Sequence, residues 1–486
     1  MNGPLRPLRR KPSRPVPGPL GSAHWIARWA RTCLWVLLAL GLTGCRKFQV
    51  IVPDMARTHR KVQLEGSNGR MLSASQSKAI LNKLKAGGQE ANLFDLHLEI
   101  EQQLTGTPIT TGNSVALLQD GPATYQAMEI AIRGAHDHIN METYILADDE
   151  VGQKFAGMLM DKQKEGVQVN LIHDAIGTLG TPASFFEKLS KTGVKVLEFN
   201  PVNPLTAKFG WDVNQRDHRK ILIVDGATAF LGGINISAVY SGGSFRKRVS
   251  NPHKAEDRPW RDTDLQVGGP VVADLQKAFM DTWERQKGEA LPPRAYFPKV
   301  GHQGKELVRA IASGPYEPFS LMYATLLSQI NGAESEILLT NAYFAPDPQL
   351  MKALLAAAKR GVKVRIVLPS VTDSWLVFHA GRSHYGRLLR GGVKLYERRD
   401  VMLHSKTVLI DGVWSTVGST NLDWRSFLHN QEVNVAILGA EFGAKMRASF
   451  EEDVAASREI TREEWRRRPF SLKVREQFAR LLEYWL

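Results

Sequence analysis

The sequence HRKILIVDGATAFLGGIN spans residues 218–235, and HSKTVLIDGVWSTVGSTN spans residues 404–421. Both stretches read H-x-K, four residues, D, six residues, and then G-[SG]-x-N. One match to H-x-K-x4-D would be weak, but two copies with the same continuation at the same offset indicate an internal duplication. The pattern therefore predicts two related halves, each of which contains one copy.

The segments around the two copies repeat an alternation of helix and strand. Residues 125–145, YQAMEIAIRGAHDHINMETYI, read as a helix followed by a strand, and residues 319–344, FSLMYATLLSQINGAESEILLTNAYF, repeat that order. This alternation predicts an α/β fold with two duplicated α/β sandwich domains, spanning residues 113–295 and 296–454. Each domain is expected to have a central mixed, largely parallel sheet flanked by helices.

Composition and charge restrict the kind of partner. The chain has 486 residues, of which 43% are hydrophobic and 23% charged, as is typical of a globular protein. Its net charge of +14 favours an anionic partner. That partner could be nucleic acid, an anionic lipid surface or a phosphorylated small molecule, and charge alone does not choose among them.

The N-terminal region predicts a membrane attachment. A basic, Pro-rich opening precedes the short apolar run TCLWVLLALGLTGC, which is typical of a signal peptide. Its last four residues, LTGC, resemble the bacterial lipobox and imply that Cys45 is lipidated. We therefore predict a lipoprotein-type signal peptide over residues 1–44. The alternative is an uncleaved membrane anchor that begins near Trp25. If the signal is cleaved, Cys33 leaves with it and the chain forms no disulfide.

Two further segments flank the predicted domains. Residues 45–112 form the anchor and a helical N-terminal segment, in which SQSKAILNKLKA and EANLFDLHLEIEQQL have the apolar spacing of helices that pack on the main body. Residues 455–486 form a basic, amphipathic tail. Val474, Phe478, Leu481, Leu482 and Trp485 share one face of its last helix, which either lies on a membrane surface or docks on the protein.

Within each motif the spacing predicts a division of labour. His218 and Lys220 are two residues apart on a predicted strand, so their side chains leave the same face. His404 and Lys406 repeat this arrangement. Each copy therefore places a base and a cation side by side, and we assign all four residues to the catalytic site.

The remaining motif positions suit turns and phosphate contacts. Asp225 and Asp411 belong to the catalytic motif, but each precedes a glycine in a hairpin-turn dipeptide, so we expect their role to be mainly structural. Asn235 and Asn421 offer neutral donors after glycines that permit close backbone approach. Together with Lys220 and Lys406, these asparagines are predicted to bind the phosphate of a substrate.

The paired motifs resemble the HKD signature of the phospholipase D superfamily. In that family two halves face each other across a pseudo-dyad and form a single active site. The resemblance implies that His218 attacks phosphorus to form a covalent phosphohistidine. It also implies that His404 protonates the departing alcohol and then deprotonates the incoming one.

The resemblance also implies which carboxylates orient the histidines. Each histidine is paired with a carboxylate of the other half, which gives His218 with Glu432 and His404 with Asp262. Such a carboxylate fixes the tautomer and stabilises the charged ring. Asp264 competes with Asp262 for this role. The motifs contain no paired histidines and carboxylates at zinc spacing, so we expect neither a metal nor another cofactor.

Within the superfamily, the chain is most similar to bacterial cardiolipin synthases, over roughly residues 113–450. GGVKLYE at residue 391 and GSTNLDWRSFLHNQEVN at residue 418 carry this likeness. It implies a membrane-associated phosphatidyl transferase whose partners are phosphatidylglycerol, or a similar phospholipid, and a membrane surface. The expected location is the bacterial cell envelope, with the catalytic domains outside the cytoplasm.

Three other functions remain open from the sequence. A hydrolytic phospholipase D would differ only in accepting water, and a nucleic-acid phosphodiesterase would exploit the positive charge. A lipid-binding protein without activity is the third. The intact motifs oppose this last function, and the absence of a base-stacking aromatic pattern opposes nucleic acid as a partner.

Overall fold

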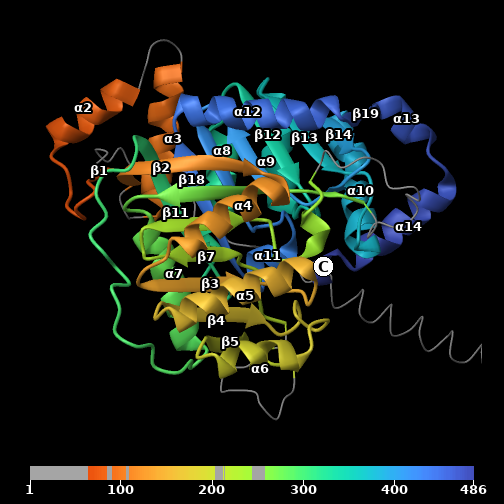
Figure 1. Ribbon diagram of the computed structural model, residues 1–486. Helices are drawn as coiled ribbons and strands as arrows, with labels where there is room; N and C mark the ends of the chain where they lie inside the picture. Colours follow the sequence, from red (N-terminus) through yellow and green to blue (C-terminus); the bar gives the residue numbers. More distant parts are fainter. Residues whose placement is uncertain (1–63, 85–89, 106–108, 203–211, 213, 244–257) are drawn as a thin grey trace, which may run out of the picture. The chain divides into compact units, whose positions relative to one another are not determined.

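The computed structural model describes residues 64–84, 90–105, 109–202, 212, 214–243 and 258–486 (Figure 1). The predicted signal peptide and the predicted lipidation site Cys45 lie outside these residues. The fold of the described part follows the two halves that the sequence predicts.

The first half is built on one mixed sheet. Strands β3 (His138–Thr143), β4 (Gln168–Asp174) and β5 (Lys195–Phe199) pair in parallel. Antiparallel pairing then continues from β3 through β7 (Ile221–Val224), β8 (Thr228–Gly232), β10 (Thr263–Gly268) and β2 (Ile109–Gln119). The helices of this half are α4 (Asp120–Arg133), α5 (Glu150–Lys164), α6 (Ala183–Lys191) and α7 (Val272–Arg285).

The second half repeats this arrangement. Strands β12 (Glu336–Asn341), β13 (Lys363–Pro369) and β14 (Lys394–Arg398) are parallel. Antiparallel pairing continues from β12 through β16 (Lys406–Ile410), β17 (Trp414–Gly418), β18 (Asn430–Leu438) and β11 (Glu306–Ser313), and β19 (Ser457–Ile460) adds to β14. The helices are α8 (Leu321–Gly332), α9 (Pro348–Lys359), α10 (Trp375–Arg390), α11 (Trp424–Leu428) and α12 (Ala440–Ala455). The predicted α/β duplication is confirmed.

The expectation of a largely parallel sheet is wrong. In each half three neighbouring strands pair in parallel, and α-helical crossovers connect them. The strands that follow each H-x-K segment instead form hairpins, because the turns at residues 225–227 and 411–413, each of which begins with Asp-Gly, reverse the chain. Hairpins are antiparallel, so each sheet has more antiparallel than parallel pairings.

Strand β2 joins the two sheets. Residues 114–119 pair with β10 of the first half, whereas Thr110 and Asn113 pair with β11 of the second. A buried cluster between the halves combines Phe279 of α7 with Phe442 of α12 and with apolar side chains of both sheets. The halves therefore share a core, which fixes the two motifs relative to each other.

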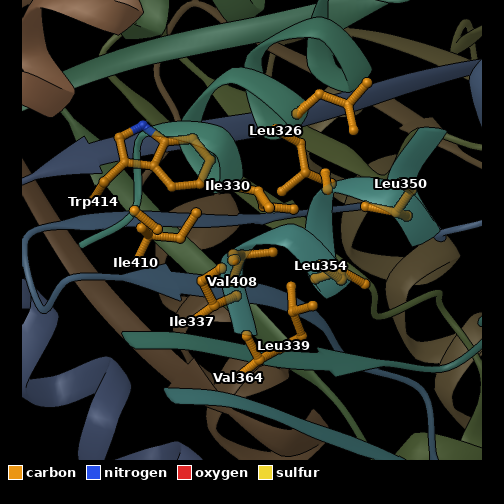
Figure 2. Close-up of a cluster of buried hydrophobic side chains, with 14 of the residues drawn as sticks. Leu326, Ile330, Ile337, Leu339, Leu350, Leu354, Val364, Val408, Ile410 and Trp414 are labelled. Carbon is orange, nitrogen blue, oxygen red and sulfur yellow. The ribbon is translucent and has the colours of Figure 1, made fainter. Parts of the chain in front are cut away.

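A second core packs helices onto the outer face of the second sheet. Figure 2 shows Leu326 and Ile330 of α8, with Leu350 and Leu354 of α9, above side chains of β12, β13 and β16. The two helices predicted before residue 112 are present as α2 (Ala74–Leu84) and α3 (Glu90–Thr105). Leu98 of α3 belongs to this core, so the N-terminal segment packs on the main body as expected.

The chain ends in α13 (Arg462–Arg467), α14 (Phe470–Leu481) and the short 3-10 helix η3 (Glu483–Trp485). Helices α13 and α14 lie beside α10 (Figure 1). Among the described residues, none of the helices combines the length and apolar character that crossing a bilayer requires.

Candidate active site

Each H-x-K segment is tied to the opposite half through its backbone. The amide of His218 donates to the carbonyl of Gln431 (3.0 Å), and the amide of His404 donates to the carbonyl of Arg261 (2.8 Å). Short parallel strands reinforce both ties, because β6 (Arg216–Asp217) pairs with β18 and β15 (Met402–Leu403) pairs with β9 (Trp260–Arg261). The histidines themselves lie just before β7 and β16, not within them as predicted. Pairing across the halves positions both motifs.

The side chains repeat this reciprocal arrangement. Nδ1 of His218 lies 3.1 Å from both carboxylate oxygens of Glu432, and Nδ1 of His404 lies 2.7 Å from Oδ2 of Asp262. The competing carboxylate, Asp264, instead accepts from the amide of Ile234 (3.1 Å). Each histidine therefore has a carboxylate partner from the other half at Nδ1, and Nε2 of each ring has no carboxylate partner in the part of the chain that the structure describes.

The two motif lysines add positive charge beside the histidines. Nζ of Lys406 lies 2.8 Å from Nδ1 and 3.0 Å from Nε2 of His404, and Nζ of Lys220 donates to the carbonyl of His218 (2.6 Å). Burial lowers the pKa of Lys220 to about 7 and the pKa of Lys406 to about 8. A bound anion would favour the protonated form of both lysines.

The histidines and their carboxylates are buried, and burial governs their protonation. Burial lowers the pKa of His218 despite the neighbouring Glu432, and burial together with Lys406 holds the pKa of His404 well below its ordinary value. Burial also raises the pKa of Asp262 to about 6. Burial opposes ionisation of Glu432, but the charge and hydrogen bond of His218 outweigh it and lower the pKa of that carboxyl. These shifts favour neutral imidazoles beside an ionised Glu432.

The motif aspartates lie at the opposite end of the hairpin strands. Asp225 accepts from the backbone amides of residues 136, 137 and 138 at 2.8–3.0 Å, and Asp411 accepts from those of residues 334, 335 and 336 at 2.7–2.9 Å. Both residues have a positive φ, 52° for Asp225 and 53° for Asp411, as the turn requires. Their contacts are those of the structural role expected from the turn, and neither carboxylate contacts a motif histidine in the described part of the chain.

The asparagines differ in their engagement. The amide of Asn235 accepts from the backbone of Ile145 and donates to the hydroxyl of Tyr240, both at 3.0 Å. The side-chain oxygen of Asn421 is buried without a hydrogen-bond partner among the described residues. Asn235 therefore shapes the site through Tyr240, and phosphate binding by the two asparagines stays a prediction.

Aromatic residues that were not predicted as site residues lie beside the histidines. Tyr240, Trp260 and Tyr343 have ring centroids 6.0, 5.0 and 6.1 Å from that of His404, and the ring of Tyr144 lies 5.2 Å from His218. Tyr144 and Tyr343 follow the carboxyl ends of β3 and β12, and in α/β sheets ligands bind at that end of parallel strands. This rule could have identified both tyrosines as site residues from the sequence.

A second group of polar residues lies at the edge of the site. The hydroxyl of Tyr240 lies 3.4 Å from Nδ1 of His404, and Tyr343 donates from its hydroxyl to Asp373 (2.6 Å).

No group of three or more His, Cys, Asp or Glu residues in the described ranges could hold a metal ion. The arrangement offers two imidazoles, two ammonium groups and two carboxylates, which together can bind a phosphodiester and exchange protons with its oxygens.

Comparison with known proteins places these motifs in context. A family model described as "Cardiolipin synthase, PLD-like domain" matches residues 128–241 and 326–454, so each matched segment contains one H-x-K motif. A cardiolipin synthase of Halalkalibacterium halodurans is 34% identical over 400 residues, which cover 82% of this chain and 76% of that protein. Cardiolipin synthase A of Pseudomonas fluorescens is 35% identical over 379 residues, covering 77% of this chain and 75% of that protein.

A solved structure supports the fold. The crystal structure of phosphatidylserine synthase from Haemophilus influenzae superimposes with a TM-score of 0.61 at 14% sequence identity. The match covers 80% of this chain and all of that one. At this identity the likeness concerns the fold alone.

Proposed function

This chain belongs to the cardiolipin synthases with phospholipase D-like domains, and from that membership we propose that it transfers a phosphatidyl group to a hydroxyl of phosphatidylglycerol. The observation that carries the proposal is the pair of reciprocal contacts, His218 with Glu432 and His404 with Asp262. Each contact leaves one ring nitrogen for the substrate, and the lysines lie beside them to balance the phosphate charge.

The proposed reaction has two steps. The anionic phosphodiester raises the pKa of His404, which takes a proton from solvent on binding. Nε2 of His218 then attacks phosphorus and forms an N–P bond, while the bond from phosphorus to the glycerol oxygen breaks and His404 gives its proton to that oxygen. In the second step, the acceptor hydroxyl loses its proton to His404 and attacks phosphorus. The N–P bond breaks, which releases cardiolipin and restores His218.

The carboxylates support both steps by holding the rings. Glu432 accepts from Nδ1–H of His218, so the Nε2 lone pair is free to attack and the positive ring of the phosphohistidine is stabilised. Asp262 holds Nδ1 of His404 in the same way, so that Nε2 carries the transferred proton. Lys220 and Lys406 stabilise the negative charge that builds up on the phosphate oxygens.

Lipid mass spectrometry tests the reaction. The purified chain is incubated with phosphatidylglycerol vesicles and EDTA, beside His218→Ala and a matched control, His136→Ala, whose exposed side chain lies outside the site. Cardiolipin plus glycerol from the wild type and the control, but not from His218→Ala, is the expected result. Phosphatidic acid alone would assign a hydrolase, and no lipid turnover would contradict the proposal and direct the search to nucleic acids.

Attachment to the cell envelope is the second part of the proposal. The lipobox-like LTGC supports lipidation of Cys45, which would hold the catalytic domains at a membrane outside the cytoplasm. Metabolic labelling with an alkyne fatty acid is expected to mark the wild type and not Cys45→Ser. Protease added to intact spheroplasts is expected to cleave the domains, and protection from it would contradict the proposed side of the membrane.

A further inference from the structure

Helix α14 exposes an apolar face. Phe470, Val474, Phe478 and Leu481 are spaced by four, four and three residues, so they lie along one side of the helix. Their side chains are 78%, 51%, 43% and 71% exposed, and Trp485 beyond the helix is 58% exposed. The residues that α14 buries are Glu476 and Ala479. The side of the helix that carries Glu476 and Ala479 therefore packs against the protein, and the apolar stripe faces solvent.

A cationic cavity adjoins this stripe. It has a volume of about 430 Å³ and is lined by residues of α10, α13 and α14. These three helices are at the right of the view in Figure 1. Its basic lining residues are Arg387, Arg390, Arg462, Arg466, Arg468, Lys473 and Arg480. None of the described residues that line it is acidic. Lys473 and Arg480 belong to α14 itself, so one helix borders both the cavity and the stripe.

The carboxylates of the C-terminal helices already have partners. Glu476 binds the guanidinium of Arg468 with contacts of 2.7–3.2 Å, Glu463 pairs with Arg467, and Glu483 accepts from His384. Lys473 donates only to a backbone carbonyl within the described chain. The other basic side chains of the cavity form no ion pair with a described carboxylate. Their charge is therefore available to an anion.

We propose that α14 and this cavity form a second lipid site, outside the catalytic centre, that docks the protein on an anionic bilayer. The cavity receives the phosphate of an anionic phospholipid, and the apolar stripe enters the acyl region beside it. Both features are needed to choose this occupant, because an RNA or an acidic peptide would satisfy the positive charge but leave the stripe in water. Docking would also bring lipid substrate close to the catalytic site, and this consequence rests on the proposed function. Lipid binding at α14 does not depend on it.

The short helix η3, which follows α14, contacts the segment that follows the second motif. The ring of Tyr484 in η3 lies 5.7 Å from that of Trp424 in α11, and the amide of Arg425 donates to the carbonyl of Leu486 (3.2 Å). Helix α11 begins three residues after Asn421. A bilayer bound to α14 would therefore lie on a helix that continues into η3, which contacts the segment following the motif of His404.

Vesicle sedimentation of the full-length chain tests the site. Vesicles of phosphatidylcholine with phosphatidylglycerol are compared with phosphatidylcholine alone. Arg387→Glu/Arg390→Glu and Phe478→Ser/Leu481→Ser are each expected to weaken binding to the anionic vesicles by about tenfold or more. The controls are Lys188→Glu/Lys352→Glu, with the same change in net charge on other exposed surfaces, and Ile130→Ser/Leu179→Ser, which alters two exposed apolar residues elsewhere. Both controls should bind like the wild type.

Two outcomes would overturn the lipid site. The first is that the cavity variant and the stripe variant both bind anionic vesicles as strongly as the wild type. The second is that Arg387→Glu/Arg390→Glu weakens binding to an RNA oligonucleotide but leaves binding to the vesicles unchanged. Melting curves identify any variant that unfolds, in which case Arg387→Gln/Arg390→Gln replaces the charge reversal. Turnover of a short-chain phosphatidylglycerol dissolved as monomers is expected to be unchanged in every variant. Its absence in the wild type would contradict the proposed function, while the binding result would still decide the lipid site.

Discussion

Nδ1 of His218 lies 3.1 Å from the carboxylate of Glu432, a residue 214 positions later in the chain. The same relationship, with the halves exchanged, joins His404 to Asp262. Neither half contains both members of a pair. The active site is therefore a property of the assembled halves, and the shared core around Phe279 and Phe442 is what holds its geometry.

Replacing Glu432 by Gln should reduce kcat by about 10²–10⁴-fold with a smaller change in KM, because the amide removes the charge that fixes the tautomer of His218 and stabilises its positive ring. The rates are measured by cardiolipin formation. The control is Glu334→Gln, on the exposed surface. A loss of less than about threefold in Glu432→Gln would show that the contact does not serve the reaction.

The covalent step should be visible in the quenched enzyme. With phosphatidylglycerol labelled at phosphorus, rapid denaturation at alkaline pH is expected to leave label on the wild-type protein, because phosphohistidine survives base. The label should map to His218. His218→Ala should carry none, and label on His404 would reverse the assigned roles of the two histidines.

The rate should fall on the alkaline side of neutrality. The pKa values of Lys220 and Lys406 are about 7 and about 8, so raising the pH removes protons from the free enzyme and with them the charge that attracts phosphate. We expect kcat/KM to decline with apparent pKa values in this range, which belong to the coupled pair. Lys220→Arg should move the decline to higher pH, since arginine keeps its proton. A flat profile up to about pH 9 would contradict the assignment.

Asp411 should matter to stability more than to chemistry. Burial opposes its ionisation, but Nε2 of His97 at 2.9 Å and three backbone amides outweigh it and lower the pKa of Asp411 to about 2. A carboxyl with a depressed pKa in the folded state stabilises the fold above its unfolded pKa of about 4, and this stabilisation is lost as the pH falls toward 2.

Asp411→Asn should therefore lower the free energy of unfolding at pH 7 by about 2–3 kcal/mol, and by less near pH 3. Denaturant unfolding at the two pH values measures the difference, and Asp400→Asn, at an exposed turn, is the control. An equal loss at both pH values would mean that the charge of Asp411 is not what stabilises the turn.

Tyr240→Phe should reduce kcat by about tenfold without unfolding the protein. Its hydroxyl lies 3.4 Å from Nδ1 of His404 and accepts from Asn235, and losing a buried hydrogen bond of this kind costs about 1–1.5 kcal/mol. Tyr316→Phe, at a half-exposed position, is the control. Equal kcat values for Tyr240→Phe and the wild type would restrict Tyr240 to a packing role.

The duplication, the His and Lys pairs and the turns at Asp225 and Asp411 can be predicted from the sequence alone. These features are local, because each Asp-Gly turn forms a hairpin between strands that are neighbours in the sequence, and its repetition can be seen without knowledge of the rest of the fold. The partners of His218 and His404 came from family resemblance, since nothing in the spacing of Glu432 or Asp262 specifies a residue more than a hundred positions away.

Other features depend on contacts between distant parts of the chain and are seen in the folded protein alone. In each sheet the antiparallel pairings outnumber the parallel ones. The order of strands in a sheet depends on which distant segments pair, and local sequence patterns do not specify this. The fold places Trp260 beside His404, which comes 144 positions later in the chain. Periodicity showed that α14 has an apolar face but not which way that face turns. The ion pair with Arg468 allows Glu476 to be buried, because burying an unpaired carboxylate would be costly. With Glu476 turned toward the protein, the apolar stripe of α14 faces solvent.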